Sequence, residues 1–154
     1  MEQRMPEGIV PPNSPDAERS VLGAMMRAAE AVMLAQESLK SVDFYDPAHR
    51  EIFDAMLHVT AMGRPVDLVT LNEELSRRGT LDGVGGLDYL IQLNQFVPTA
   101  ANVGAYIRIV DDKATLRRLI EAAQGISRAC FSGEEETPDI LAAAEKSIYD
   151  ITMR

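Results

Sequence analysis

The sequence has very few of the residues that build covalent or metal-held scaffolds. It contains one cysteine, Cys130, and two histidines, His49 and His58, in 154 residues. A single cysteine excludes an internal disulfide framework, and we expect Cys130 to be a small buried apolar residue. Nine positions apart, the histidines share no helix face, and the Asp46 and Glu51 near His49 are a common pairing in the first turn of a helix. We therefore expect no metal site, and structural or solvated roles for both histidines.

The sequence also lacks long apolar runs and an excess of positive charge. No stretch reaches the roughly 18 apolar residues of a membrane span, and no signal-peptide pattern is present, so we expect a soluble, cytoplasmic protein. Lysine and arginine number 15 against 24 acidic residues, a net charge of −9. That balance disfavours tight binding to nucleic-acid phosphates. Hydrophobic residues make up 46%, which is typical of a folded globular chain.

A proline-free stretch over residues 102–131 organises the chain. Its apolar residues recur at steps of three and four, the spacing of a coiled-coil seam. A helix of this length would extend roughly 45 Å, beyond the reach of a compact domain of about 100 residues. We expect its seam to be buried against another element. The seam consists of Leu116, Leu119, Ala123, Ile126 and Cys130, after an offset stripe of Val103, Ile107, Val110 and Ala114.

A second helix is predicted after the acidic loop at 134–136. Gly133 suits the left-handed position that follows a helix end, and Thr137 and Pro138 favour an N-cap and first helical position. The new helix carries an apolar stripe of Leu141, Ala144, Ile148 and Ile151. Two antiparallel helices with matching stripes form a hairpin. The stripes then either pack on the rest of the chain or mediate self-association.

Residues 14–97 predict a small multi-helix head without strands. Ser14, Asp46 and Asp67 are typical N-caps, and Gly63 and Gly79 are typical helix ends. Residues 1–13 lack periodicity and predict a flexible arm. The expected fold class is therefore all-α, with arm 1–13, helical head 14–97 and a long antiparallel hairpin 98–154 for oligomerisation.

No pattern indicates catalysis. The glycine-rich turn at 83–86 lacks the preceding strand and the Lys-Ser or Lys-Thr step of a phosphate loop. The carboxylates form no convergent pair for acid–base chemistry. The basic residues Arg117 and Arg118 fit a solvated helix face with intrahelical pairs, and docking of an acidic partner is the alternative.

Three stretches resemble the N-terminal domain of the bacterial replicative DNA helicases of the DnaB family. They are PPNSPDAERSVLGAMM (11–26), DFYDPAHREIFDAMLHVTAMGRPVDLVTLNEEL (43–75) and VGGLDYLIQLNQFVPTAANVGAYIRIVDDKATLRRLI (84–120). They keep the family's order and spacing over most of the chain. The combination of SVLGA, FY-x-x-x-H-x-x-IF, PVDLVTL, GG-x-x-YL and PTAAN makes the match specific, although each piece alone is weak.

The resemblance implies a function that periodicity does not. In the family, hairpins pair and assemble into a collar, a trimer of dimers on one face of the hexameric ring. The collar docks the C-terminal helicase-binding domain of primase, and in some bacteria it meets a helicase loader. We therefore expect a bacterial collar domain that mediates homo-oligomerisation, from dimer to hexamer, and primase docking during DNA replication.

The motor of the family is a separate C-terminal ATP-binding domain. This sequence ends at Arg154 without a GxxxxGK[ST] loop. We therefore expect no ATPase or unwinding activity from this chain, although the parent protein resembles an ATP-dependent 5′–3′ DNA helicase. We also expect no cofactor, since ATP and magnesium would bind only in the missing domain.

Two sets of interface residues are expected. An exposed seam suits a symmetric homo-oligomer, and its predicted residues are Val110, Leu116, Leu119, Ala123, Ile126, Cys130, Leu141, Ala144 and Ile148. By resemblance, primase binding is expected at Tyr89, Ile120 and Ile126. The alternatives are a head-core role for Tyr89 and hairpin packing alone for the two isoleucines.

Rival functions remain open. A helical dimerisation adaptor unrelated to replication would also form dimers but would ignore primase. A small helical enzyme would need a pocket around His49. Direct contact with single-stranded DNA is disfavoured by the acidic balance, although a local basic patch could guide a strand.

Overall fold

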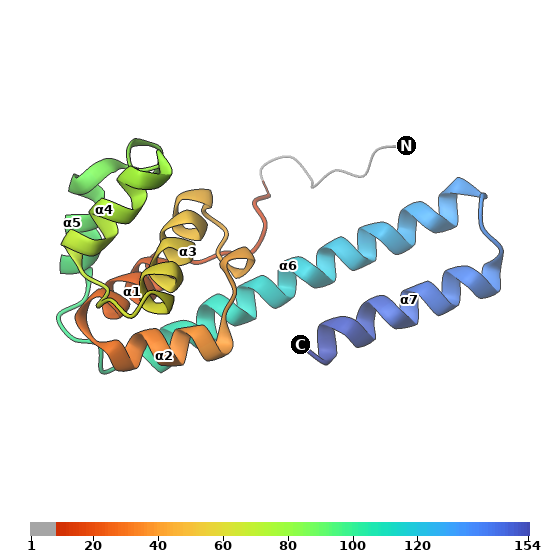
Figure 1. Ribbon diagram of the computed structural model, residues 1–154. Coiled ribbons are helices and arrows are strands. Elements are labelled where there is room, and N and C mark those ends of the chain that lie inside the picture. The colour runs from red at the N-terminus through yellow and green to blue at the C-terminus, as the bar shows by residue number, and fades with distance from the viewer. Residues whose placement is uncertain (1–8) are drawn as a thin grey trace. The chain divides into compact units, whose positions relative to one another are not determined.

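The fold is all-helical in a computed structural model that describes residues 9–154 (Figure 1). This stretch contains seven α-helices and two 3₁₀ helices, and no strand occurs within it. A multi-helix head is followed by a long antiparallel hairpin, so the predicted fold class is confirmed. The chain divides into two compact units, which we call the head unit (residues 13–112) and the hairpin unit (113–154 with the segment up to Pro12). Most of the predicted flexible arm lies outside the described residues.

The head unit is built from short helices with local start signals. In chain order they are α1 (Pro15–Arg27), α2 (Ala29–Ser38), η1 (Ser41–Asp43), α3 (Pro47–Ala61), α4 (Leu68–Arg78), η2 (Asp82–Val84), α5 (Gly86–Phe96) and the first turns of α6 (Val103–Ser132). The side chains of Ser14, Asp46 and Asp67 each accept a backbone N–H of the following helix. These three predicted N-caps are confirmed, and each satisfies a donor that the helix geometry leaves free.

The head core is continuous from α1 to the start of α6. Its large, fully buried side chains include Phe44 and Phe53, whose ring centroids are 4.9 Å apart. Val103, Ile107 and Val110 of α6 belong to the same core, where they are almost completely buried. Burial of such side chains contributes about 1.5–3 kcal/mol each relative to exposure, so the head has its own source of stability.

Helices α1 and α5 approach each other closely at Gly23. A Cβ atom at Gly23 would lie 2.4 Å from the carbonyl oxygen of Leu93 and 3.5 Å from a methyl carbon of Val97. No real side chain tolerates the first distance without a backbone shift. The glycine of the SVLGA stretch is therefore required by packing, because only a hydrogen fits where α1 crosses α5.

A charged network connects α3 with α4. Arg78 contacts Glu51 of α3 and Glu74 of α4, each at 2.6 Å, and Arg77 contacts Glu74 at 2.7 Å. Hydrogen bonds from Arg77 and Arg78 lower the pKa of Glu74 from its usual 4.5 to about 2, although burial acts in the opposite direction. Glu74 is therefore an almost buried carboxylate that is stabilised in its charged form.

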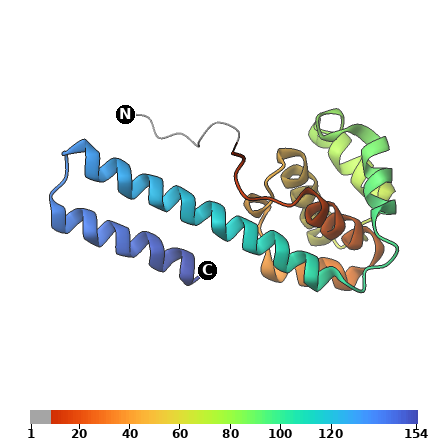
Figure 2. The same ribbon diagram turned by 180° about the vertical axis from the view of Figure 1, so that it is seen from behind.

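In the hairpin unit, α6 continues to Ser132 and α7 (Thr137–Thr152) runs back beside it (Figures 1 and 2). Gly133 adopts φ +69° after α6, as predicted. The N-cap of α7 is Glu136, one residue before the predicted Thr137. Pro138 suits either start, because the first backbone N–H groups of a helix have no intrahelical partner. None of the helices in the described chain is both long and apolar enough to cross a membrane.

We predict that Gly23→Ala destabilises the protein by about 1–3 kcal/mol, because the new methyl group overpacks the α1–α5 contact. Denaturant unfolding of purified variants measures this change. Gly104→Ala in α6 is the matched control, since no atom lies within 4 Å of its added Cβ. There the substitution should be neutral or stabilising by up to about 1 kcal/mol. Equal effects at both sites would contradict the packing argument.

We predict that Glu74 makes stability sensitive to acid. Because its pKa is lower in the folded chain, its contribution is complete above about pH 4.5 and is lost as the pH falls toward 2. Glu74→Gln should therefore cost about 1–3 kcal/mol at pH 7 and much less near pH 2. Thermal unfolding at a series of pH values tests this. The control is Glu73→Gln, whose side chain is 69% exposed; a similar pH profile for both variants would refute the role of Glu74.

Candidate interaction surfaces

Helix α7 contains no buried residue. Its partly covered residues Ile140, Ala144 and Ser147 line a hollow of about 310 Å³ between α6 and α7, opposite Ala122 and Gly125. The predicted stripe and this line share Ala144, and Ile151 of the stripe is also partly covered, but two positions differ. Ile140 and Ser147 occupy the places expected for Leu141 and Ile148, which are 60% and 43% exposed. The hairpin therefore closes mainly on small side chains together with Ile126 and Ile140, and it leaves its leucines exposed.

The predicted seam of α6 is also largely exposed. Leu116 and Leu119 are 44% and 38% exposed, and Ala123 is exposed as well. Cys130 is a free, exposed thiol, so its predicted burial is wrong for this chain. Its position on the seam did not ensure burial, since α7 does not cover that face of α6. Phe131, Tyr149 and Met153 add exposed apolar surface to the same unit.

Three other predicted interface residues are less exposed than Leu116 and Leu119. Val110 is 1% exposed and packs in the head core, so its side chain does not reach the surface. Ile126 is partly exposed and lines the hollow between α6 and α7. Ile120 is partly exposed on α6. The structure thus brings Ile126 together with Ala144 in the hairpin.

Tyr89 lies on α5 at the edge of the head core, with its ring partly exposed. Its hydroxyl contacts Nε2 of His49 at 2.5 Å, and Nδ1 of His49 contacts Oε1 of Glu18 at 2.7 Å. His49 is completely buried and Glu18 is 2% exposed. Burial raises the pKa of Tyr89, so the phenol keeps its proton at neutral pH. The structural role predicted for His49 is therefore confirmed, within a network that includes Tyr89.

Sequence reasoning missed Glu18 as the partner of His49. The two residues are 31 positions apart, whereas the carboxylates that the sequence places near His49 are Asp46 and Glu51. A signal was available, because Glu18 lies one turn before Leu22, on the buried side of an amphipathic helix. A charged residue on such a face needs a buried partner.

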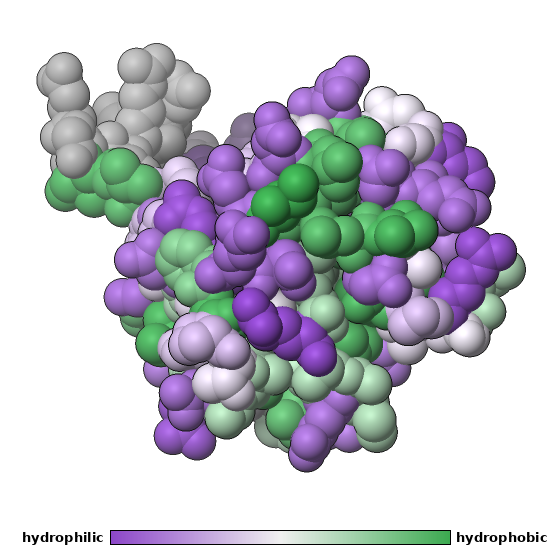
Figure 3. All heavy atoms as spheres, turned by 90° about the vertical axis from the view of Figure 1, so that its left-hand side faces the viewer, coloured by the Kyte–Doolittle hydropathy of each residue, from purple (hydrophilic) through white to green (hydrophobic). Residues whose placement is uncertain are grey.

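Arg19 lies near both Tyr89 and Phe96, and we call these three residues the Tyr89 face. The guanidinium of Arg19 lies 5.9 Å from the ring centroid of Phe96 and forms an ion pair with Asp16 at 3.0 Å. A hydrogen bond from Arg19 also acts on Tyr89 and opposes the effect of burial on its pKa. Phe96 is 42% exposed. Figure 3 views the molecule from the α4–α5 end, where hydrophobic side chains are exposed between hydrophilic ones.

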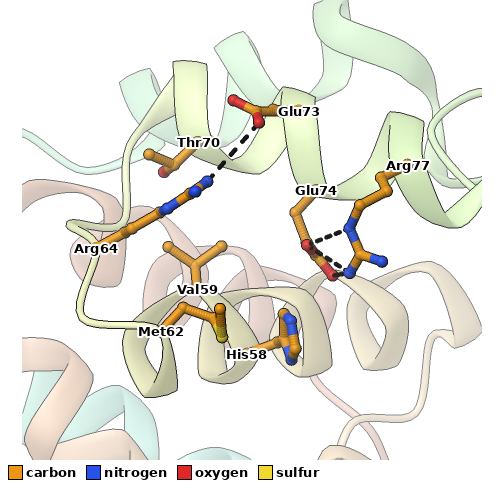
Figure 4. A pocket seen from close by; sticks show the side chains of 8 residues that line it. All are labelled: His58, Val59, Met62, Arg64, Thr70, Glu73, Glu74 and Arg77. Atoms are coloured by element: carbon orange, nitrogen blue, oxygen red, sulfur yellow. Dashed lines mark hydrogen bonds and ion pairs between the residues drawn. The ribbon is translucent and has the colours of Figure 1, made fainter.

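A polar pocket of about 400 Å³ lies between α3 and α4 (Figure 4). Its charged side chains are largely paired, Glu74 with Arg77 and Arg64 with Glu73 at 3.7 Å. No nucleophile lies beside a base here. Across residues 9–154, no three histidine, cysteine or acidic side chains are grouped as metal ligands.

The basic residues of α6 form internal contacts. Arg117 donates a hydrogen bond to the carbonyl oxygen of Pro12 at 2.7 Å, within the hairpin unit. Arg118 donates to Thr115 in the same helix at 3.2 Å. The intrahelical pairing predicted for this group is therefore present at Arg118, while Arg117 binds the segment that precedes α1.

Comparison with known proteins gives a consistent result. The family model of the DnaB-like helicase N terminal domain matches residues 10–112. The replicative DNA helicase DnaC of Bacillus subtilis (strain 168) is 43% identical over 145 residues, which cover 94% of this chain and 32% of that protein. The chain thus spans about a third of the length of this curated relative.

Two solved structures share the fold. The crystal structure of the N-terminal domain of DnaB helicase from Mycobacterium tuberculosis superposes with a TM-score of 0.87 at 42% identity, covering 92% of this chain and 99% of that one. A structure of a DnaB-like replicative helicase and its interactions with primase gives a TM-score of 0.71 at 24% identity, over 90% of this chain and 31% of that one. The second likeness shows the fold alone. The family match and the first structure show that this chain belongs to the DnaB-like helicase N-terminal domain family.

Proposed function

We propose that this chain is the collar domain of a hexameric replicative DNA helicase, where it joins protomers through the α6–α7 hairpin and docks primase. The main support for joining of protomers through the hairpin is that α7 has no buried residue. A helix of this length gains most of its stability from packing of an apolar face, because isolated helices of about 12–15 residues are marginal in water. The apolar face of α7 therefore needs a partner outside the chain described here.

A second copy of the chain is the partner that fits best. Both helices of the hairpin expose large apolar side chains, namely Leu116, Leu119, Phe131, Leu141, Ile148 and Tyr149. Apolar patches of this kind mark protein–protein interfaces. A symmetric dimer would cover the same stripe on both copies with one set of contacts. We propose the interface at Leu116, Leu119, Ala123, Ile126, Cys130, Leu141, Ala144 and Ile148, without Val110.

The family supports the larger assembly and the second partner. Its members include replicative helicases, and one solved structure with this fold describes a DnaB-like helicase and its interactions with primase. We propose that the dimers assemble into a trimer of dimers and that primase docks at Tyr89, Ile120 and Ile126. Tyrosine and arginine are typical of binding hot spots, and phenylalanine is enriched in interface cores; the Tyr89 face contains one of each.

We expect Leu119→Asp combined with Ile126→Asp to reduce the oligomer to monomers, because each charge would be buried in the apolar interface. Light scattering behind a sizing column measures the mass. The control is Val69→Asp on α4, which is 74% exposed in the head and should leave the mass unchanged. An unaltered mass for the double variant would rule out the seam as the interface.

We expect the wild-type oligomer to gain mass when it is mixed with the C-terminal helicase-binding domain of primase. Tyr89→Ala should weaken this binding about tenfold or more, in the range of a hot-spot residue. Met33→Ala, at a residue that is 62% exposed on α2, is the control. An oligomer that ignores primase at tens of micromolar would instead favour the helical dimerisation adaptor.

A further inference from the structure

The buried contacts behind Tyr89 determine which group carries each proton. Both carboxylate oxygens of Glu18 already accept backbone N–H groups, from Tyr45 at 2.7 Å and from Asp46 at 3.3 Å. With its oxygens acting as acceptors, Glu18 requires a donor from His49 at 2.7 Å. The proton between them therefore belongs to Nδ1 of the imidazole ring, and His49 is held as the tautomer protonated at that nitrogen.

The same reasoning applies to the other side of the ring. Nε2 of His49 is 2.5 Å from the hydroxyl of Tyr89 and 3.9 Å from the nearest oxygen of Asp46, which is too far for a hydrogen bond. Arg19, the other neighbour of the phenol, can only donate. With Nδ1 as the donor to Glu18, the neutral ring leaves Nε2 as the acceptor of the phenol proton. The oxygen of Tyr89 then accepts from Arg19 and can accept one further hydrogen bond.

The backbone also holds the Tyr89 ring in place. Gly85 precedes α5 with φ +115°, and a Cβ there would lie 2.7 Å from Cβ of Tyr89. The His49 and Tyr89 rings are nearly parallel, with 10° between their planes and centroids 5.9 Å apart. The ring is thus confined by a glycine on one side and by a buried imidazole on the other.

We infer that Glu18 and His49 form a positioning pair that presents Tyr89 as an outward-facing hydrogen-bond acceptor, so that the docking partner must place an N–H or O–H donor opposite the phenol oxygen. This inference rests on the proposed docking of primase at Tyr89. It specifies the chemistry of the contact, since an ionised carboxylate has no proton to donate to the phenol oxygen. His49 and Glu18 act through Tyr89 and do not touch the partner.

The first test measures which ring nitrogen of His49 carries a proton. Long-range ¹H–¹⁵N spectra of the full chain at neutral pH should show His49 protonated at Nδ1 and unprotonated at Nε2. His58 is exposed and serves as an internal reference. A His49 ring protonated at Nε2, alone or together with Nδ1, would overturn the inference.

The second test separates the two contacts of His49 by side-chain length. His49→Asn keeps an amide donor near Glu18 but cannot reach Tyr89, so affinity for the primase domain should fall about five- to tenfold. His49→Gln extends an amide to the hydroxyl of Tyr89 and should bind primase within about twofold of the wild type, with a lower melting temperature. His58→Gln on the same helix is the control and should change neither quantity.

The outcomes distinguish this inference from the proposed function. If the wild type binds primase and His49→Asn, confirmed as folded by its melting curve, binds equally well, the positioning pair is wrong while the docking role survives. If the wild type binds no primase, the proposed docking fails, and the spectra alone decide the proton arrangement. Tyr89→Phe should weaken binding as much as His49→Asn, because both remove the positioned acceptor; unchanged binding would contradict the inference.

Discussion

The close crossing of α1 and α5 is the constraint on which the head depends. Gly23 lets the backbone of α1 approach the carbonyl of Leu93, where any side chain would collide. The same two helices carry Glu18 and Tyr89, which meet on opposite sides of the His49 ring from α3. A wider separation of α1 and α5 would lengthen both hydrogen bonds, so a packing requirement and a polar network share one geometry.

The two units differ in how much of their apolar surface they bury. The head buries phenylalanine, leucine and methionine side chains in a continuous core, although residues such as Val69 and Phe96 remain exposed. The hairpin closes on alanine, glycine and serine with Ile126 and Ile140 around a hollow, and it exposes its leucines. Small residues allow two helices to approach, but they bury little area and contribute little hydrophobic free energy. The head therefore has a buried core of its own, whereas α7 in the hairpin has no buried residue and depends on further contacts.

Local signals predicted most of the fold, and long-range contacts accounted for most of what was missed. Caps at Ser14, Asp46 and Asp67 depend on residues within three positions, so they could be read from the chain. Glu18 and His49 are joined across 31 positions, and helical periodicity contains no information at that distance. The hairpin stripe was wrong at Leu141, because Ile140 and Leu141 are adjacent and similarly apolar. Only packing against α6 distinguishes these two residues. Cys130 is a second case, because its place on the stripe predicted burial and it is exposed.

Cys130 is the only thiol in the chain, and it is exposed on the apolar stripe of α6. A maleimide dye or a spin label would therefore attach at one position without any cysteine having to be removed or introduced. Because thiol modification requires access by the reagent, the labelling rate reports how open that stripe is to solvent. The unaltered chain thus contains its own probe of hairpin exposure, which can be read at protein concentrations too low for scattering.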